Sequence, residues 1–233
     1  MAIAVGSGIT FEQGITITSV PPIYTLEVGT KEPVLGIGAQ SPFPAAGWTA
    51  IASTTADDTF AQVQLPFSWT FNNTGYISFF PNSNFYITFG SGSTTFNALS
   101  ASNPALNKIF FAGADNSWQR VSKITEGTNY TRLRWEGTDS TSGTPGSPNM
   151  VYELTFFNPI STGGVPWLEL LVGLQARGTS STISSICSTT TLLAGLGPSN
   201  KGVSALQSYV LQGNASGTAW TVNTGFHVGG TGY

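Results

Sequence analysis

Two glutamates, Glu136 and Glu153, come nearest in type and spacing to hydrolytic chemistry. They fall in two segments of alternating polar and apolar residues that we expect to be neighbouring β-strands. A glycosidase needs two carboxyl groups at a fixed separation across its substrate. The same positions also suit cross-strand pairing with Arg132 or Arg134. We expect this pairing, rather than hydrolysis, to be the role of the two glutamates.

The sequence contains few residues that could form a nucleophilic or transition-metal centre. His227 is the only histidine and Cys187 the only cysteine. Zinc and iron sites need several such ligands, and a Ser-His-Asp triad would need a nucleophile elbow that the sequence lacks. Glycine-rich nucleotide-binding patterns are also missing. We therefore expect no enzyme activity, no cofactor, no zinc or iron, and no intrachain disulfide.

Calcium is the one metal that the sequence leaves open. Asp57 with Asp58, and Asp115 with Asn116, could join backbone carbonyl groups around Ca²⁺ in loops of a β-sandwich. The dense carboxylate spacing of a dedicated calcium loop is absent, so we do not expect a metal site.

A sugar-binding surface is a second open possibility. Trp118 lies in a polar stretch between Asn116 and Arg120, and aromatic rings of this kind stack on sugars. The alternative for Trp118 is that its ring covers a sheet edge.

Composition excludes several classes of protein. Only 8% of the residues are charged, the net charge is −3, and the eight Lys and Arg are scattered singly, which argues against nucleic-acid binding. No apolar run is long enough to span a membrane, and the first residues lack the cationic start of a secretory signal. So low a surface charge favours a symmetric homo-oligomer.

The same composition predicts an all-β fold. Threonine, aromatic and β-branched residues are punctuated by 28 glycines and 13 prolines, which favours strands and turns over helices. The clearest strand has a wet face and a buried face: Gln62, Gln64, Ser68 and Thr70 alternate with Val63, Leu65, Phe67, Trp69 and Phe71. Pro66 falls on the wet face and predicts an edge or a bulge there.

Further strands are expected at intervals of 8–20 residues. They cover residues 76–80, 85–89, 108–112, 120–124, 130–136, 151–157, 167–174, about 189–193, 209–212 and 219–228. This pattern predicts an antiparallel two-sheet β-sandwich of the jelly-roll type, with Trp69 and Trp220 in its core.

The chain divides into three parts. Residues 1–58 are rich in Gly and Pro and predict an extended N-terminal arm and linker, residues 59–228 form the sandwich, and residues 229–233 are a short Gly-rich tail. Within the arm, a Gly-Ile-Thr-apolar repeat at residues 8–11 and 14–17 has two interpretations. One is a short strand pair with glycine turns. The other is an assembly interface whose apolar face packs on another subunit through Ile9, Phe11, Ile15 and Ile17.

Several segments together resemble a block found in β-sandwich virion proteins of tailed phages, especially phages of marine cyanobacteria. These segments are residues 58–67, 86–93, 100–104, 107–110, 114–121, 134–138, 147–157 and 208–211. The first part of this block also looks, more weakly, like the start of nidogen-type extracellular sandwiches.

This resemblance implies a non-enzymatic structural protein of the virion, either a capsid decoration or a tail or fibre accessory. It would be attached through the N-terminal arm to other capsid or tail proteins, and made in the host cytoplasm without secretion. The competing interpretation is a carbohydrate-binding adhesin that recognises a host surface glycan.

Overall fold

Antiparallel β-sheets account for nearly all of the regular structure. The computed structural model describes residues 24–29, 31, 47–52, 56–94, 107–110, 116–139, 150–174, 185–188, 191–194 and 207–230. Within these residues the only helical element is a short 3-10 helix, η1 (Pro159–Thr162). None of the described segments is a helix long and apolar enough to cross a membrane. The predicted all-β class is confirmed.

Two large sheets and one small ribbon contain the strands. The larger sheet has the order β14 (Trp220–Thr224), β13 (Gln207–Gly213), β10 (Trp167–Leu174), β9 (Met150–Phe157), β8 (Tyr130–Asp139), β7 (Asn116–Glu126), β2 (Thr49–Ala52). The smaller sheet has the order β12 (Thr191–Ala194), β11 (Ser185–Ser188), β6 (Asn107–Phe110), β5 (Tyr86–Phe89), β4 (Thr74–Pro81), β3 (Val63–Phe71). The ribbon pairs β1 (Thr25–Val28) with β15 (Phe226–Gly229).

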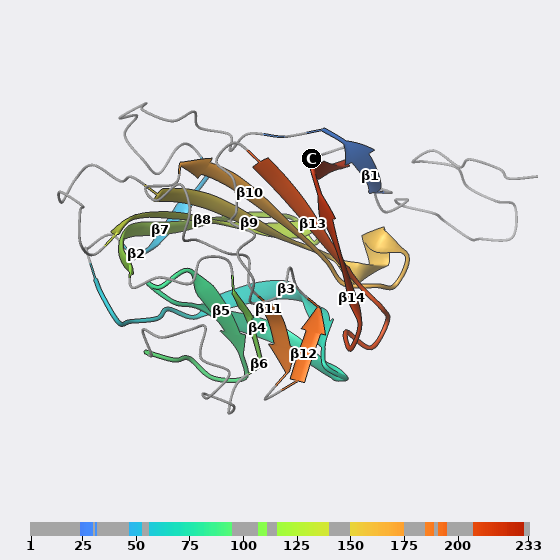
Figure 1. Cartoon of the computed structure of the whole chain (residues 1–233), viewed down its shortest axis with the longest axis horizontal. Helices are drawn as coiled ribbons and strands as arrows, with labels where there is room; N and C mark the ends of the chain where they lie inside the picture. Colours follow the sequence, from blue (N-terminus) through green and yellow to red (C-terminus); the bar gives the residue numbers. More distant parts are fainter. Residues whose placement is uncertain are drawn as a thin grey trace, which may run out of the picture.

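The two large sheets face each other as the layers of a sandwich (Figure 1). Their inner faces enclose one main hydrophobic core, to which β3, β5, β8, β9, β10 and β13 all contribute. β1 lies on the outer side of the larger sheet, beside the C-terminal strands (Figure 1). The inner face of the larger sheet is the one that meets the smaller sheet, and the outer face is the opposite one.

β3 shows how the alternating pattern becomes packing. Its residues alternate between buried and solvent-facing along the whole strand, as predicted. Trp69 is fully buried, its ring lies 4.9 Å from that of Phe156 and 5.4 Å from that of Trp220, and its Nε1 donates to the carbonyl of Trp167. Both tryptophans are therefore in the core, as expected.

Pro66 stands where the register between β3 and β4 breaks. Gln64 pairs with Ser78 and Trp69 pairs with Tyr76, so four residues of β3 lie opposite one residue of β4. β3 is also the last strand of the smaller sheet within the described part of the chain. A proline has no N–H for the ladder, and both the edge and the bulge predicted for this position are present.

Some predicted strand boundaries and the predicted connectivity differ from the structure. The segment 219–228, expected as one strand, divides at Gly225 into β14 and β15. β1 and β2 lie within residues 1–58, and both pair with later parts of the chain. Jelly-roll connectivity is not confirmed, because strands that follow one another in sequence mostly pair within one sheet. Residues 1–23 and the tail residues 231–233 lie outside the described residues.

Candidate functional site

The outer face of the larger sheet carries a row of charged side chains. On β8, Leu133 and Trp135 point into the main core, so Arg132, Arg134 and Glu136 occupy the opposite face. Residues directly opposite on paired strands share a face. This places Arg120 of β7 beside Glu136, and Glu153 of β9 beside Arg134. We call these five residues the charge ladder.

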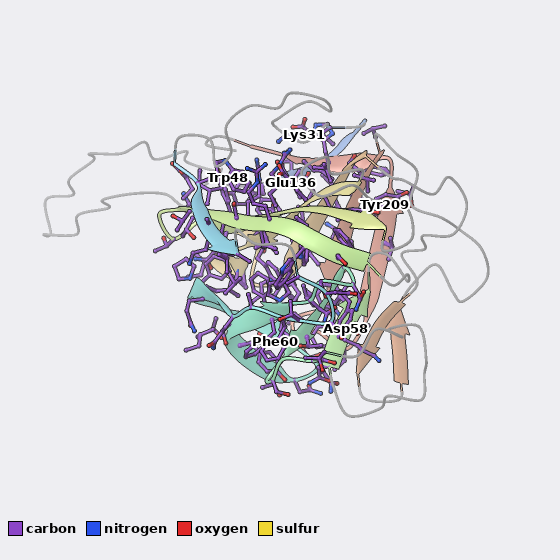
Figure 2. All side chains as sticks on the ribbon, turned by 90° about the vertical axis from the view of Figure 1, so that its left-hand side faces the viewer. Lys31, Trp48, Asp58, Phe60, Glu136 and Tyr209 are labelled. Atoms are coloured by element: carbon purple, nitrogen blue, oxygen red, sulfur yellow. The ribbon has the colours of Figure 1, made fainter. Side chains whose placement is uncertain are left out.

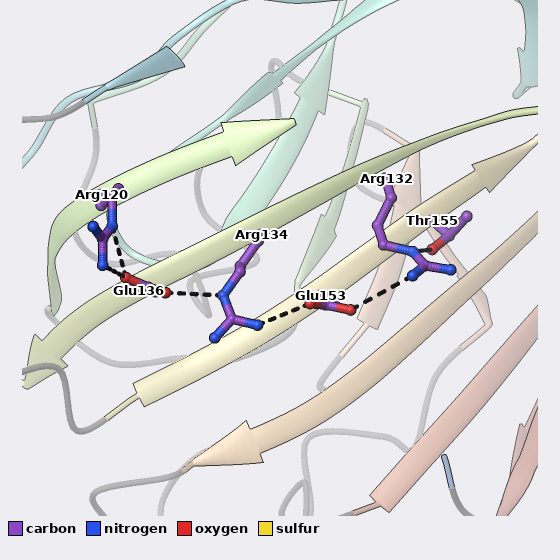
Figure 3. A network of polar contacts seen from close by, with 6 residues as sticks. All are labelled: Arg120, Arg132, Arg134, Glu136, Glu153 and Thr155. Carbon is purple, nitrogen blue, oxygen red and sulfur yellow. Dashed lines mark hydrogen bonds and ion pairs between the residues drawn. The ribbon is translucent and has the colours of Figure 1, made fainter. Parts of the chain in front are cut away.

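The ladder is a continuous chain of ion pairs (Figure 3). Arg120 Nη2 lies 2.5 Å from Glu136 Oε2, and Arg134 Nε donates to Glu136 Oε1 at 2.9 Å. Arg134 Nη1 donates to Glu153 Oε1 at 2.9 Å, while Arg132 Nη1 lies 3.9 Å from Glu153 Oε2. Each glutamate is therefore held between two guanidinium groups.

The ladder is buried although it belongs to an outer face. Four of its members, Arg132, Arg134, Glu136 and Glu153, are no more than 6% exposed. Arg132 also donates from Nε to Thr155 Oγ1, and its guanidinium carbon lies 5.5 Å from the ring centre of Tyr130. Buried charges are costly unless paired, and the ladder supplies the pairing for each of these groups.

Glu169 of β10 extends the charged face by one more strand. Its side chain is fully buried, and Oε1 accepts a 2.7 Å hydrogen bond from the backbone N–H of Val228. Burial raises the pKa of Glu169 to about 7, against the smaller lowering effects of the Val228 hydrogen bond and of Lys31 and Arg132. Burial also lowers the pKa of Lys31, which the charge of Glu169 opposes. Both Lys31 and Glu136 lie on the outer side of the larger sheet (Figure 2).

A small apolar cluster lies beside these charges, under the β1–β15 ribbon. It contains Tyr24, Tyr130, Phe157, Val210 and Val228, separate from the main core. Burial raises the pKa of Tyr24 to about 12 and raises that of Tyr130.

The only histidine also belongs to the ribbon. His227 Nε2 lies 3.3 Å from Glu27 Oε2, at a position where the two residues are directly opposite in the β1–β15 pair. His227 therefore contributes a contact between the two strands of the ribbon.

The geometry of the ladder favours a structural role. A general acid must carry a proton and face its substrate. Glu136 and Glu153 instead share Arg134 as an ion-pair partner and are both buried. The predicted cross-strand pairing is confirmed for Glu153, which contacts Arg134 and Arg132 of β8. Glu136 instead pairs with Arg134 of its own strand and with Arg120 of β7.

The three residues predicted to contact a glycan do not form a joint surface among the described side chains. Trp118 is 3% exposed and packs in the main core, so its ring offers no open face for a sugar to stack on. Arg120 is engaged by Glu136. The side chain of Asn116 lies outside the described part of the structure.

The predicted assembly residues Ile9, Phe11, Ile15 and Ile17 also lie outside the described residues, as do Asp115 and the side chain of Cys187.

Of the aspartates considered as calcium ligands, Asp57 and Asp58 are described by the structure. Asp57 Oδ1 accepts from the backbone N–H of Asp58, and Asp58 Oδ1 accepts from Asn84 Nδ2. No group of three or more metal-ligating side chains occurs in the described segments.

Sequence reasoning missed Glu169, Lys31 and Tyr24. Glu169 interrupts the apolar run of β10, and a lone carboxylate between leucines was the available signal. Tyr24 and Lys31 carried no comparable signal, because their neighbours come from strands more than 100 residues away.

Comparisons with known proteins add no relative. No protein-family model, no curated protein and no solved structure matches this chain.

Proposed function

We propose that this protein is a non-enzymatic structural component of a tailed-phage virion, serving as a capsid decoration or as a tail or fibre accessory. It attaches to other virion proteins through its N-terminal arm, with the apolar face of Ile9, Phe11, Ile15 and Ile17 as the contact. The arm residues repeat an alternating apolar pattern that a short segment cannot bury by itself.

The main observation that supports the proposal is the charge ladder. The protein has few charged residues, and five of them form the ladder across β7, β8 and β9, where four are buried. The wet face of β3 presents glutamines and hydroxyl groups in their place. A sandwich with so few charged residues suits close packing against neighbouring subunits, where an unpaired charge would be costly.

The segments that resemble virion sandwiches support the same proposal. They include β5, β6 and β9, which line the core, and residues 134–138, which contain part of the ladder. These segments make up the sandwich itself and carry no catalytic residues.

The test is an inventory of purified particles. Particles of the virus that encodes this sequence are purified, and their proteins are quantified by mass spectrometry against the major capsid protein. We expect a fixed copy number per particle that survives a high-salt wash. Absence from particles, or a copy number that varies with washing, would contradict the proposal.

The adhesin alternative keeps the same fold but requires a sugar-binding surface. A glycan array probed with the full chain distinguishes the two. Specific binding that is lost in Arg120→Ala would favour the adhesin, whereas an array without binding, together with a fixed copy number in particles, favours the structural component.

A further inference from the structure

The β1–β15 ribbon is attached to the sandwich as a separate unit. It comprises residues 24–29 and 225–230, and each of its two strands pairs with the other rather than with a strand of the larger sheet. Its apolar side chains join the small cluster with Tyr130, Phe157 and Val210 instead of the main core. The ribbon therefore lies outside the core between the two large sheets.

The two ends of the ribbon are held by backbone contacts. At one end, Gly225 N donates to the carbonyl of Ser208, Gly29 N donates to the carbonyl of Gly225, and Ser208 Oγ donates to the carbonyl of Gly29. Gly225 has a φ of 75° and would meet nothing within 4 Å if it carried a Cβ. The positive φ favours glycine at this position. At the other end, Tyr24 N donates to the carbonyl of Ser161 at 3.3 Å.

The middle of the ribbon is held by a carboxyl group. Glu169 belongs to β10, and its Oε1 accepts a 2.7 Å hydrogen bond from the backbone N–H of Val228. This N–H lies on the edge of β15 that is not paired with β1. The residues opposite Glu169 on the neighbouring strands are Thr155 and Val210, which carry no charge.

Charged groups reach Glu169 from three directions. Lys31 and Arg132 favour its ionised form, and Glu153 of β9 disfavours it. The ribbon contributes a second titratable pair, Glu27 with His227. Burial outweighs both the Val228 hydrogen bond, which favours the ionised form, and these charges, and it raises the pKa of Glu169 to about 7, so the carboxyl group changes its charge near neutral pH.

We propose that the ribbon is a pH-dependent strap, closed over the outer face while Glu169 is neutral and released from it as Glu169 ionises. Release gives the carboxylate access to water, and it uncovers the apolar surface of Tyr130, Phe157 and Val210. Because residues 1–23 join the sandwich at Tyr24, release also frees the point from which the N-terminal arm departs.

The size of the effect follows from proton linkage. In the released state Glu169 is solvated and regains an ordinary carboxyl pKa, so rising pH favours release between the two pKa values. From pH 5 to pH 8 the equilibrium constant for release should increase on the order of 50- to 100-fold for a shift of this size.

Hydrogen–deuterium exchange of the full chain, followed by mass spectrometry, measures this constant. Peptides covering β1 and β15 are compared with a peptide covering β9, at several pH values from 5 to 8 and after correction for intrinsic exchange rates. We expect the protection of the ribbon to fall tens-fold with rising pH while that of β9 stays constant. A ribbon whose protection is independent of pH would overturn the proposal.

Two variants identify the titrating group. Glu169→Gln keeps the oxygen that accepts from Val228 and removes the charge, so ribbon protection should become independent of pH. His227→Gln removes the histidine of the ribbon's ion pair and should leave the wild-type response unchanged. If instead the response persists in Glu169→Gln, or disappears in His227→Gln, the assignment to Glu169 is wrong. Should Glu169→Gln fail to fold, the wild type still decides whether ribbon protection depends on pH, and His227→Gln decides whether His227 is the cause.

Discussion

Replacing Glu153 by glutamine tests the charge ladder most directly. The side chain is fully buried, and its two oxygens lie between Arg134 at 2.9 Å and Arg132 at 3.9 Å. Glutamine has nearly the same shape and still offers an oxygen to Arg134, so the change removes charge while leaving the packing intact. The ladder then contains three guanidinium groups but a single carboxylate, that of Glu136.

The expected cost is that of breaking a buried ion pair from one side, about 3–5 kcal/mol of unfolding free energy. For a chain of this length this corresponds to a fall in melting temperature of about 6–20 °C. Urea unfolding followed by circular dichroism gives the free energy, and calorimetry gives the melting temperature.

Glu126→Gln is the matched control. Glu126 lies exposed at the end of β7, and loss of its charge should change stability by no more than about 0.5 kcal/mol. The double variant Glu153→Leu with Arg134→Met should recover much of the loss, because it removes one charge of each sign from the buried face. If Glu153→Gln is as stable as Glu126→Gln, the ladder is not a stabilising element and the reasoning fails.

Three further predictions concern the core, the pH response and the arm. Trp69→Ala should cost about 3–5 kcal/mol of unfolding free energy because it leaves a cavity among stacked rings, whereas Ile77→Ala, at an exposed position, should cost little; urea unfolding compares them. Because the pKa of Glu169 is raised in the folded state, its contribution is fully present below about pH 4.5 and is lost as the pH rises to about 7. The unfolding free energy obtained from urea titrations should therefore fall over this range by up to about 3 kcal/mol in the wild type and less in Glu169→Gln. Deletion of residues 1–20 should leave the melting temperature unchanged but abolish oligomerisation in light scattering; unfolding of the truncated chain would show instead that the arm belongs to its own core.

Local alternation along the chain was enough to predict much of the sandwich. Each residue of a strand points to the opposite side from the next, so the sequence of β3 by itself determines which residues, including Trp69, face the core. Pro66 fixes its own edge and bulge because a missing N–H is a property of the residue, independent of its neighbours. The pairing of Glu153 with an arginine of β8 was also within reach, since β8 and β9 follow each other along the chain.

Burial of the outer face of the larger sheet was decided only by the tertiary structure. In β8, Arg132, Arg134 and Glu136 alternate with apolar residues, which from sequence indicates a solvated face; instead these side chains are covered. The partner of β1 lies about 200 residues away, as the hydrogen bond from Thr25 to Gly229 shows, and no local pattern encodes such a pairing. The environment of Glu169 depends on that same distant contact, because its oxygen binds an N–H of β15. Alternation specifies which residues share a face, whereas the cover of that face depends on contacts between segments far apart in the sequence.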